Sequence, residues 1–354
     1  MRLSMSLLLL FATVVLALWG AGLVWFQGPA RAGRRTALAA LWLAWLGGCV
    51  LWGWSPQRMA TAWGLWLASL AAMLCWWSGL RPSNARDWAD DVARPLHMQP
   101  LGPWSRGRQR LALERVRNFR WRSEADYDPR WERRSYDLAH LASVDVAASY
   151  WMGPAIAHTL VSFGFDDGEQ LVFSIEIRKR RGEQFNALAG FFRRYELALV
   201  AADERDILAV RTNVRGEQVH LYRVAMPREV MRELFVAYVR EAEALRGQPR
   251  FYNTLTANCT TIVWQLARRV GARLPLDWRL LASGYLPEYL RDLGVLTPSH
   301  TLEQLRAAGD ITARARAWVA PPQADDRAAG IAFSRAIRAG MPPLPAQATE
   351  NTPE

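Results

Sequence analysis

The chain of 354 residues contains only three cysteines, which limits both disulfide and metal chemistry. Cys49 and Cys75 lie in long apolar stretches, so Cys259 has no partner in the remainder of the chain. A disulfide framework is therefore excluded. The histidines of that remainder stand at no metal-ligand spacing from Cys259, so we expect no metal site and no other cofactor.

Lysine is almost absent: Lys179 is the only one, and the formal net charge of +11 therefore comes from arginine. A basic surface suits anionic lipid headgroups or nucleic acid. Because no RNA- or DNA-binding motif accompanies the arginines, we expect a membrane surface and no nucleic acid as partner. Single arginines such as Arg178, Arg205 and Arg211 are expected to be solvated surface charges.

Three stretches without any charged residue open the chain, at Leu7–Phe26, Thr36–Trp54 and Met59–Leu80. Each approaches the ~20 residues that a bilayer span needs, and tryptophans gather toward their ends, as in an interfacial belt. We therefore predict a membrane region, residues 1–83, with three transmembrane helices. A buried core helix, or a signal peptide cleaved at Ala32, is the alternative.

The charges give two answers for the orientation of these helices. The first loop carries Arg31, Arg34 and Arg35, and the positive-inside rule would place this loop and the C-terminal domain in the cytoplasm. Three spans with Arg2 inside would instead place the domain outside. Composition alone leaves both orientations open.

After the membrane region we expect a linker at residues 84–110, rich in proline, arginine and tryptophan. A globular domain follows at residues 111–320, and residues 321–354 are predicted to be a disordered tail. The periodicity predicts strands at 144–146, 158–165, 170–177, 207–212 and 219–224, and helices at 184–193, 227–245 and 260–270. These do not alternate regularly, which indicates an α+β fold.

The tetrad Asn258-Cys259-Thr260-Thr261 stands directly before one of these helical patterns. Free N–H groups and the helix dipole favour a thiolate at a helix N-terminus. Cys259 is therefore a candidate nucleophile. The alternative is a small buried hydrophobic residue.

His158 begins the first strand of a predicted hairpin. A three-residue loop, 166–168, with Gly168 in the left-handed conformation, would pair Phe165 with Glu169 and align apolar residues on one face. The same register sets His158 opposite Glu176, close enough for the carboxylate to hold the imidazole. The alternatives are a structural histidine and a solvated glutamate, and nothing in the sequence places this pair near Cys259.

Several motifs resemble the family that carries the periplasmic domain of the Lnb-type lipoprotein N-acyltransferases. The resemblance covers roughly residues 118–278. Its motifs are Ala157-His158-Thr159-Leu160-Val161-Ser162-Phe163-Gly164-Phe165, Ser174-Ile175-Glu176-Ile177-Arg178-Lys179, Gly190-Phe191-Phe192-Arg193-Arg194-Tyr195-Glu196-Leu197, Asp203-Glu204-Arg205-Asp206, Arg211-Thr212-Asn213 and Phe251-Tyr252-Asn253-Thr254-Leu255-Thr256-Ala257-Asn258-Cys259-Thr260-Thr261. The upstream segments Arg117-Asn118-Phe119-Arg120-Trp121 and Tyr127-Asp128-Pro129-Arg130-Trp131-Glu132 also look like the family.

This resemblance implies a permuted papain-like cysteine domain, with Cys259 as nucleophile and His158 as its base. Glu176 fits the third position through the register argument. The resemblance also implies a multi-pass protein of the inner cell membrane whose catalytic domain lies in the periplasm. In the namesake enzymes the periplasmic domain comes before the membrane domain, whereas here the spans come first.

The implied activity is acyl transfer through a thioester on Cys259, with a phospholipid or lipoprotein as substrate and partner. N–H groups at the start of the Thr260 helix would bind the oxyanion. Tyr252, Asn253 and Asn258 would line the cleft, with turn and capping roles as their alternative. A cysteine hydrolase (peptidase, amidase or lipid hydrolase) and a non-catalytic envelope scaffold are the competing functions.

Overall fold

The computed structural model describes residues 2–103, 109–271 and 273–343. The chain forms two compact units, each described here by itself. The membrane unit comprises Met1–Ser83, Asn186–Glu196 and Phe251–Thr254. The soluble unit comprises Asn84–Phe185, Leu197–Arg250 and Leu255–Glu354.

The membrane unit contains three long helices, α1 (Arg2–Gln27), α2 (Ala32–Gly53) and α3 (Met59–Gly79). All three are long and apolar enough to cross a membrane, and they agree with the predicted spans. A helix suits hydrocarbon because it satisfies its backbone hydrogen bonds internally. The indole N–H of Trp45 on α2 donates to Ser69 Oγ on α3 at 2.8 Å, and Trp42 packs against Gly20 of α1.

Two short segments from later in the chain belong to the membrane unit. The segment Asn186–Glu196 contains one 3₁₀ turn, η3 (Ala189–Phe192), so the predicted helix at 184–193 is wrong. The Asn186 side chain accepts hydrogen bonds from the backbone N–H groups of Leu188 and Ala189, which starts the turn. Arg193 then adopts a left-handed φ of 55° and ends it.

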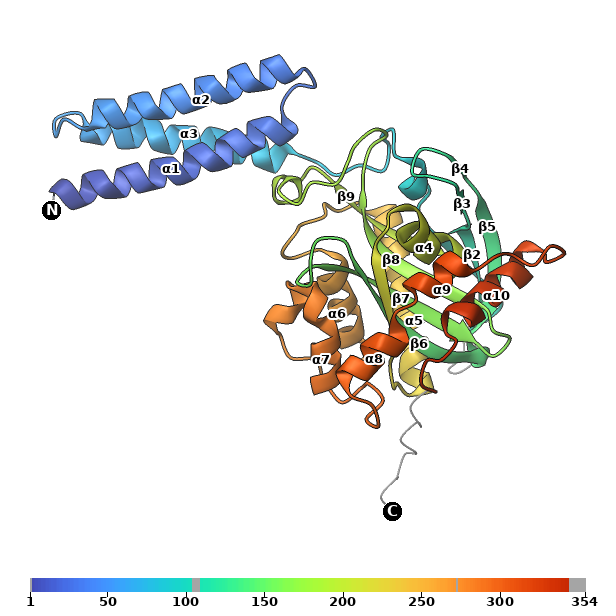
Figure 1. Cartoon of the computed structure of the whole chain (residues 1–354). Coiled ribbons are helices and arrows are strands. Elements are labelled where there is room, and N and C mark those ends of the chain that lie inside the picture. The colour runs from blue at the N-terminus through green and yellow to red at the C-terminus, as the bar shows by residue number, and fades with distance from the viewer. Residues whose placement is uncertain (1, 104–108, 272, 344–354) are drawn as a thin grey trace. The chain divides into compact units, whose positions relative to one another are not determined.

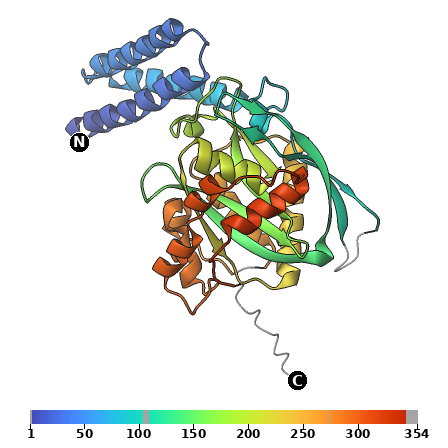
Figure 2. The ribbon, with the colours of Figure 1, turned by 45° about the vertical axis from the view of Figure 1, so that its right-hand side comes forward.

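The soluble unit is built on a mixed sheet, shown in Figures 1 and 2. Within the described residues the strands follow the order β1-β2-β9-β8-β7-β6-β10, and β5 pairs with β2. β2 and β9 are parallel, and β6, β7 and β8 form an antiparallel ladder. The bounds are β1 (His97–Pro100), β2 (Arg110–Arg117), β5 (Trp131–Asp137), β6 (Leu141–Tyr150), β7 (Ala157–Phe165), β8 (Gln170–Arg178), β9 (Glu196–Ala202) and β10 (Gln218–Arg223). A small separate ribbon pairs β3 (Arg120–Trp121) with β4 (Tyr127–Asp128).

Helices cover both faces of this sheet (Figure 1). On one face, Phe163 and Phe173 pack against Phe235 and Tyr238 of a long helix. On the other, the buried residues Leu160 and Val172 share a core with the helices of the chain's C-terminal part. The helices are α4 (Glu204–Ala209), α5 (Arg228–Gly247), α6 (Cys259–Arg269), α7 (Leu286–Asp292), α8 (Leu302–Gly309), α9 (Thr312–Ala317) and α10 (Asp326–Ile337). The α+β prediction is confirmed, and the permuted papain-like arrangement remains what the resemblance implies.

The hairpin register is confirmed. Phe163 pairs with Leu171 and Val161 with Phe173. The Phe165 N–H donates to the carbonyl of Glu169 at 2.9 Å. Gly168 has a φ of +86°, the left-handed conformation that the three-residue loop requires.

Three further local predictions are wrong. The tail predicted at 321–354 contains α10, whose residues Phe333 and Ile337 are fully buried, and residues 344–354 of that prediction lie outside the described residues. The linker predicted at 84–110 supplies the edge strand β1. The strand predicted at 207–212 is α4 followed by the π-helical turn Val210–Val214, because the Asp203 side chain caps the helix. Short apolar runs do not separate strand from helix.

Candidate active site

Asn258 starts α6 as its N-cap. Its side-chain oxygen accepts from the N–H groups of Thr260 at 2.9 Å and Thr261 at 2.8 Å. The Thr261 hydroxyl accepts in turn from the Asn258 N–H at 2.9 Å, which completes a capping box. Cys259 is therefore the first residue of the helix, as predicted.

The cap also changes the expected oxyanion site. The N–H groups of Thr260 and Thr261 are bonded to Asn258, so they do not point free at a substrate. In the first turn of α6, the N–H of Cys259 is the group that could bind the oxyanion. Asn258 is 8% exposed and its side-chain oxygen is used by the cap, which favours the capping alternative over substrate contact.

The start of α6 packs against the start of β7. The hydroxyls of Thr159 and Thr260, 101 residues apart in the chain, are hydrogen-bonded at 2.9 Å. The N–H of Thr159 donates to the sulfur of Cys259, and the sulfur also interacts with the imidazole of His158. The structure thus brings Cys259 and His158 together, which the sequence left open.

On its other side His158 faces β8. Its Nε2 lies 3.2 Å from Glu176 Oε1 and 2.8 Å from Ser174 Oγ. The Ser174 hydroxyl also donates to Glu176 at 2.7 Å. Because Nε2 is held by this pair, Nδ1 is the nitrogen left for the thiol. The predicted His158–Glu176 pair is present, and Ser174 is a member of the site that sequence reasoning missed.

These contacts set the charge state of the site. Burial and the charge of Arg211 each lower the pKa of His158, but Glu176 and Cys259 outweigh them and raise it from 6.5 to about 9. Burial would raise the pKa of Cys259, but the charge and hydrogen bond of His158 lower it below the ordinary value. The buried carboxyl of Glu176 has its pKa held well below 4.5 by His158 and Arg211. All three shifts favour the charged forms: a thiolate on Cys259, an imidazolium on His158 and a carboxylate on Glu176.

Arg211 is the second residue that sequence reasoning misjudged. It is 4% exposed, not a solvated surface charge, and Arg178 is equally buried. The π-helical turn after α4 carries Arg211, whose Nη2 donates to Glu176 Oε1 at 2.9 Å and whose Nη1 donates to Glu217 at 3.2 Å. Such turns recur at functional sites. The sequence signal for this arginine is the motif Arg211-Thr212-Asn213, which is part of the family resemblance but was given no role in the site.

Tyr252 and Asn253 lie in the membrane unit, in the segment Phe251–Thr254. Tyr252 is 9% exposed, and its N–H donates to the carbonyl of Tyr195 at 3.0 Å. Their expected place in the cleft therefore stays a prediction. The soluble unit holds Cys259, His158, Glu176 and Asn258.

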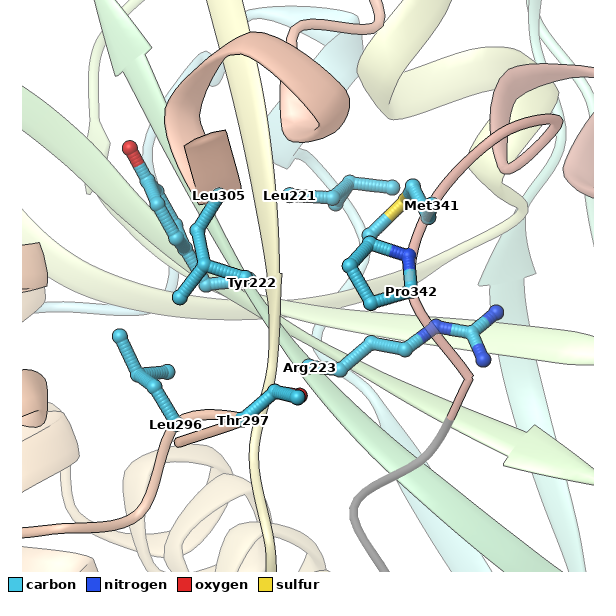
Figure 3. A pocket seen from close by; sticks show the side chains of 8 residues that line it. All are labelled: Leu221, Tyr222, Arg223, Leu296, Thr297, Leu305, Met341 and Pro342. Atoms are coloured by element: carbon cyan, nitrogen blue, oxygen red, sulfur yellow. The ribbon is translucent and has the colours of Figure 1, made fainter. Parts of the chain in front are cut away.

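A small cavity elsewhere in the soluble unit is too small for a ligand larger than water. It lies between β10 and the segments that carry Leu296, Leu305 and Met341 (Figure 3). Its volume of about 10 Å³ is no more than a water molecule needs. The lining is mostly apolar packing of the core.

Comparison with known proteins gives one match. Residues 127–284 match the family model of the Lnb N-terminal periplasmic domain, which agrees with the resemblance seen in the motifs. Neither curated proteins nor solved structures gave a match. With its three membrane helices, the chain is a membrane-anchored protein with a periplasmic domain.

Proposed function

Residues 127–284 belong to the Lnb N-terminal periplasmic domain family, and from this premise we propose that the chain is a cysteine acyltransferase of the inner membrane. The observation that carries the proposal is the position of Cys259 at the start of α6 beside His158, which Glu176 and Ser174 hold by its Nε2. A thiolate at a helix N-terminus beside a held imidazolium is an activated nucleophile. Its substrate would be an acyl ester of a phospholipid or a lipoprotein.

In the first half-reaction the Cys259 sulfur attacks the carbonyl carbon of the ester, and the carbonyl electrons move to oxygen. The Cys259 N–H stabilises that oxyanion. When the oxyanion collapses, the C–O bond to the alcohol breaks, and the His158 imidazolium gives its proton to the leaving oxygen. The products are a thioester on Cys259, a free alcohol and a neutral imidazole.

In the second half-reaction an amine attacks the thioester carbonyl. His158 takes the proton from the amine nitrogen, the C–S bond breaks, and the thiolate and imidazolium return together. Glu176 favours the charged imidazolium in both halves through its contact with Nε2. The N-terminal amine of a lipoprotein would be the acceptor.

The surface beside His158 supports an apolar substrate. The β6–β7 loop directly before His158 exposes Trp151 and Met152 by 42% and 56%, and the Trp151 ring contacts Phe185. The segment that carries Trp278 and Leu281 packs on the same loop, since the Gly284 N–H donates to the carbonyl of Ala155 at 3.0 Å. Apolar side chains that gather on one exposed surface indicate an apolar partner, such as an acyl chain.

The test uses the full chain in nanodiscs with a phospholipid that carries an alkyne-tagged acyl chain. We expect a hydroxylamine-sensitive label on Cys259 and, after addition of a diacylated lipopeptide with a free N-terminal amine, label on that amine. Replacing Cys49 and Cys75 by serine is the matched control and should leave both labels intact. Release of free fatty acid alone would show a hydrolase, with water as acceptor. A folded protein that takes no label, with Cys259 inert to thiol reagents, would show a scaffold.

A further inference from the structure

The helices of the membrane unit enclose a lateral groove of about 500 Å³, the size of a small-molecule site. Gln27 of α1 is its polar lining residue. The rest is apolar, and its principal lining side chains are Leu38, Trp42, Trp45, Met73 and Trp76. The indole N–H groups of Trp42 and Trp45 donate to Ala17 O and Ser69 Oγ. Both donors are therefore satisfied, and the two rings present apolar surface to the groove.

The groove lies at one end of the helices. Its lining comes from the end of α1, from Leu38 to Trp45 of α2 and from the end of α3. Short connections join the helices, so α1 ends where α2 begins, and α3 ends on that same side (Figure 1). Because α3 leads into the periplasmic domain, this is the periplasmic end.

Three arginines at this end form no ion pair with the residues that the structure describes. Arg31, Arg34 and Arg35 occupy the α1–α2 connection and the first turn of α2, and residues 1–83 contain no aspartate or glutamate. Arg35 stacks on Trp25 and donates to its carbonyl at 3.3 Å, while its Nε is buried without a partner within the described residues. Arg31 and Arg34 are exposed.

The position of these arginines is opposite to the positive-inside rule, which favours basic loops in the cytoplasm. Only Arg2 and Arg58 lie toward the other ends of the helices. A role in topology therefore does not explain three arginines in the first loop. A bound anion at the periplasmic membrane surface explains them, because it supplies the negative charge that residues 1–83 lack.

A segment of the membrane unit holds this end of the groove in place. Gln27 donates from its side chain to the carbonyl of Phe192 at 2.7 Å, and the Phe192 ring stacks on Phe26. Arg194 donates to the carbonyl of Phe26 at 2.9 Å, and Arg193 donates to that of Trp77 at 2.7 Å. Guanidinium groups on the last carbonyls of α1 and α3 stabilise helix ends. The mouth of the groove is thus preformed.

We propose that this groove binds one anionic phospholipid. One acyl chain lies along Trp42, Trp45 and Trp76, and the phosphate is bound by Arg31, Arg34 and Arg35. The positive charge of the mouth matches the phosphate of such a lipid, and the apolar walls match its acyl chain. The site does not rest on the thiol chemistry and would exist in an inactive protein.

The test measures lipid retention by native mass spectrometry on the full chain with Cys259→Ala, so that catalysis cannot consume the ligand. Phosphatidylglycerol is the probe and phosphatidylethanolamine the competitor. Arg34→Gln should weaken phosphatidylglycerol binding about tenfold, through loss of a charge-assisted hydrogen bond. Met73→Trp should weaken it at least as much by filling the groove. The matched controls are Arg58→Gln, an arginine at the opposite end, and Leu74→Trp, an exposed α3 position outside the groove; both should change binding less than twofold.

Cross-linking with a phosphatidylglycerol that carries a photoreactive acyl chain locates the bound lipid. We expect cross-links to residues 38–45 and 73–76. Equal losses from Arg34→Gln and Arg58→Gln would overturn the proposal, because they would show attraction of bulk anionic lipid to positive charge. Cross-links spread evenly along α3 would overturn it as well.

Discussion

Replacing His158 by alanine tests the ion pair at the centre of the site. The imidazolium lowers the pKa of Cys259 against the burial that would raise it. Without the imidazolium, burial is opposed by the hydrogen bonds from the Thr159 N–H and the Thr260 hydroxyl alone, so the pKa of the thiol should rise toward its ordinary value. We therefore expect Cys259 to react much more slowly at neutral pH in the His158→Ala protein.

The size of the effect follows from the thiolate fraction. An ordinary thiol with a pKa of about 8.5 is about 3% ionised at pH 7, so a fully ionised Cys259 has up to about 30 times more thiolate. A thiolate of lower pKa is also a weaker nucleophile, with a Brønsted slope of about 0.4–0.5, which removes part of that gain. The net loss on His158→Ala should be about tenfold, and larger where burial raises the pKa further.

The assay is the rate of alkylation by iodoacetamide from pH 5 to pH 10, on the full chain with Cys49 and Cys75 replaced by serine. For the parent protein we expect the rise in rate at a lower pH than in the His158→Ala protein, because His158 keeps its proton up to about pH 9 and lowers the pKa of Cys259. The His158→Ala protein should show one ordinary rise, about tenfold per pH unit below the thiol pKa. A parent profile that rises at the same pH, or equal rates for both proteins at pH 7, would refute the ion pair.

Three further changes probe the groups around the pair. Glu176→Gln removes the carboxylate that raises the pKa of His158, so this pKa, read from the titration of the imidazole by NMR, should fall below about 9; an unchanged pKa would contradict the contact. Arg211→Met leaves Glu176 and Glu217 without their guanidinium and should lower the free energy of unfolding by about 3 kcal/mol, measured by thermal unfolding in detergent, with Arg211→Lys as the milder control. Asn258→Ala removes the cap of α6 and should destabilise by about 1 kcal/mol. Asn258→Asp should keep that stability but slow alkylation, because it adds a negative charge beside the thiolate; faster alkylation would argue against the capping geometry.

Local features of the chain were predictable because nearby residues determine them. The three membrane helices follow from uninterrupted apolar length. The β7–β8 register follows from alternation and from one glycine in a three-residue loop. The start of α6 at Cys259 follows from an asparagine with a threonine three residues later. Each of these depends on no more than about 20 neighbouring residues.

Features that depend on distant parts of the chain were not predictable. No local pattern shows that Arg211 is buried, since its partners Glu176 and Glu217 reach it only through the folded sheet. The same holds for α10, which has the composition of a tail but places Phe333 and Ile337 in the core. Burial is a property of the packed structure, and composition constrains it only weakly.

The sequence by itself determined the parts of the candidate site: a thiol at a helix start, and a histidine whose strand register sets it opposite a glutamate. The tertiary structure decided that these parts meet, by packing the start of α6 on β7 through Thr159 and Thr260. It also added Ser174 and Arg211 to the site. The physical reason is that the charge states of Cys259 and His158 depend on burial and on each other, and both arise only when distant segments pack together.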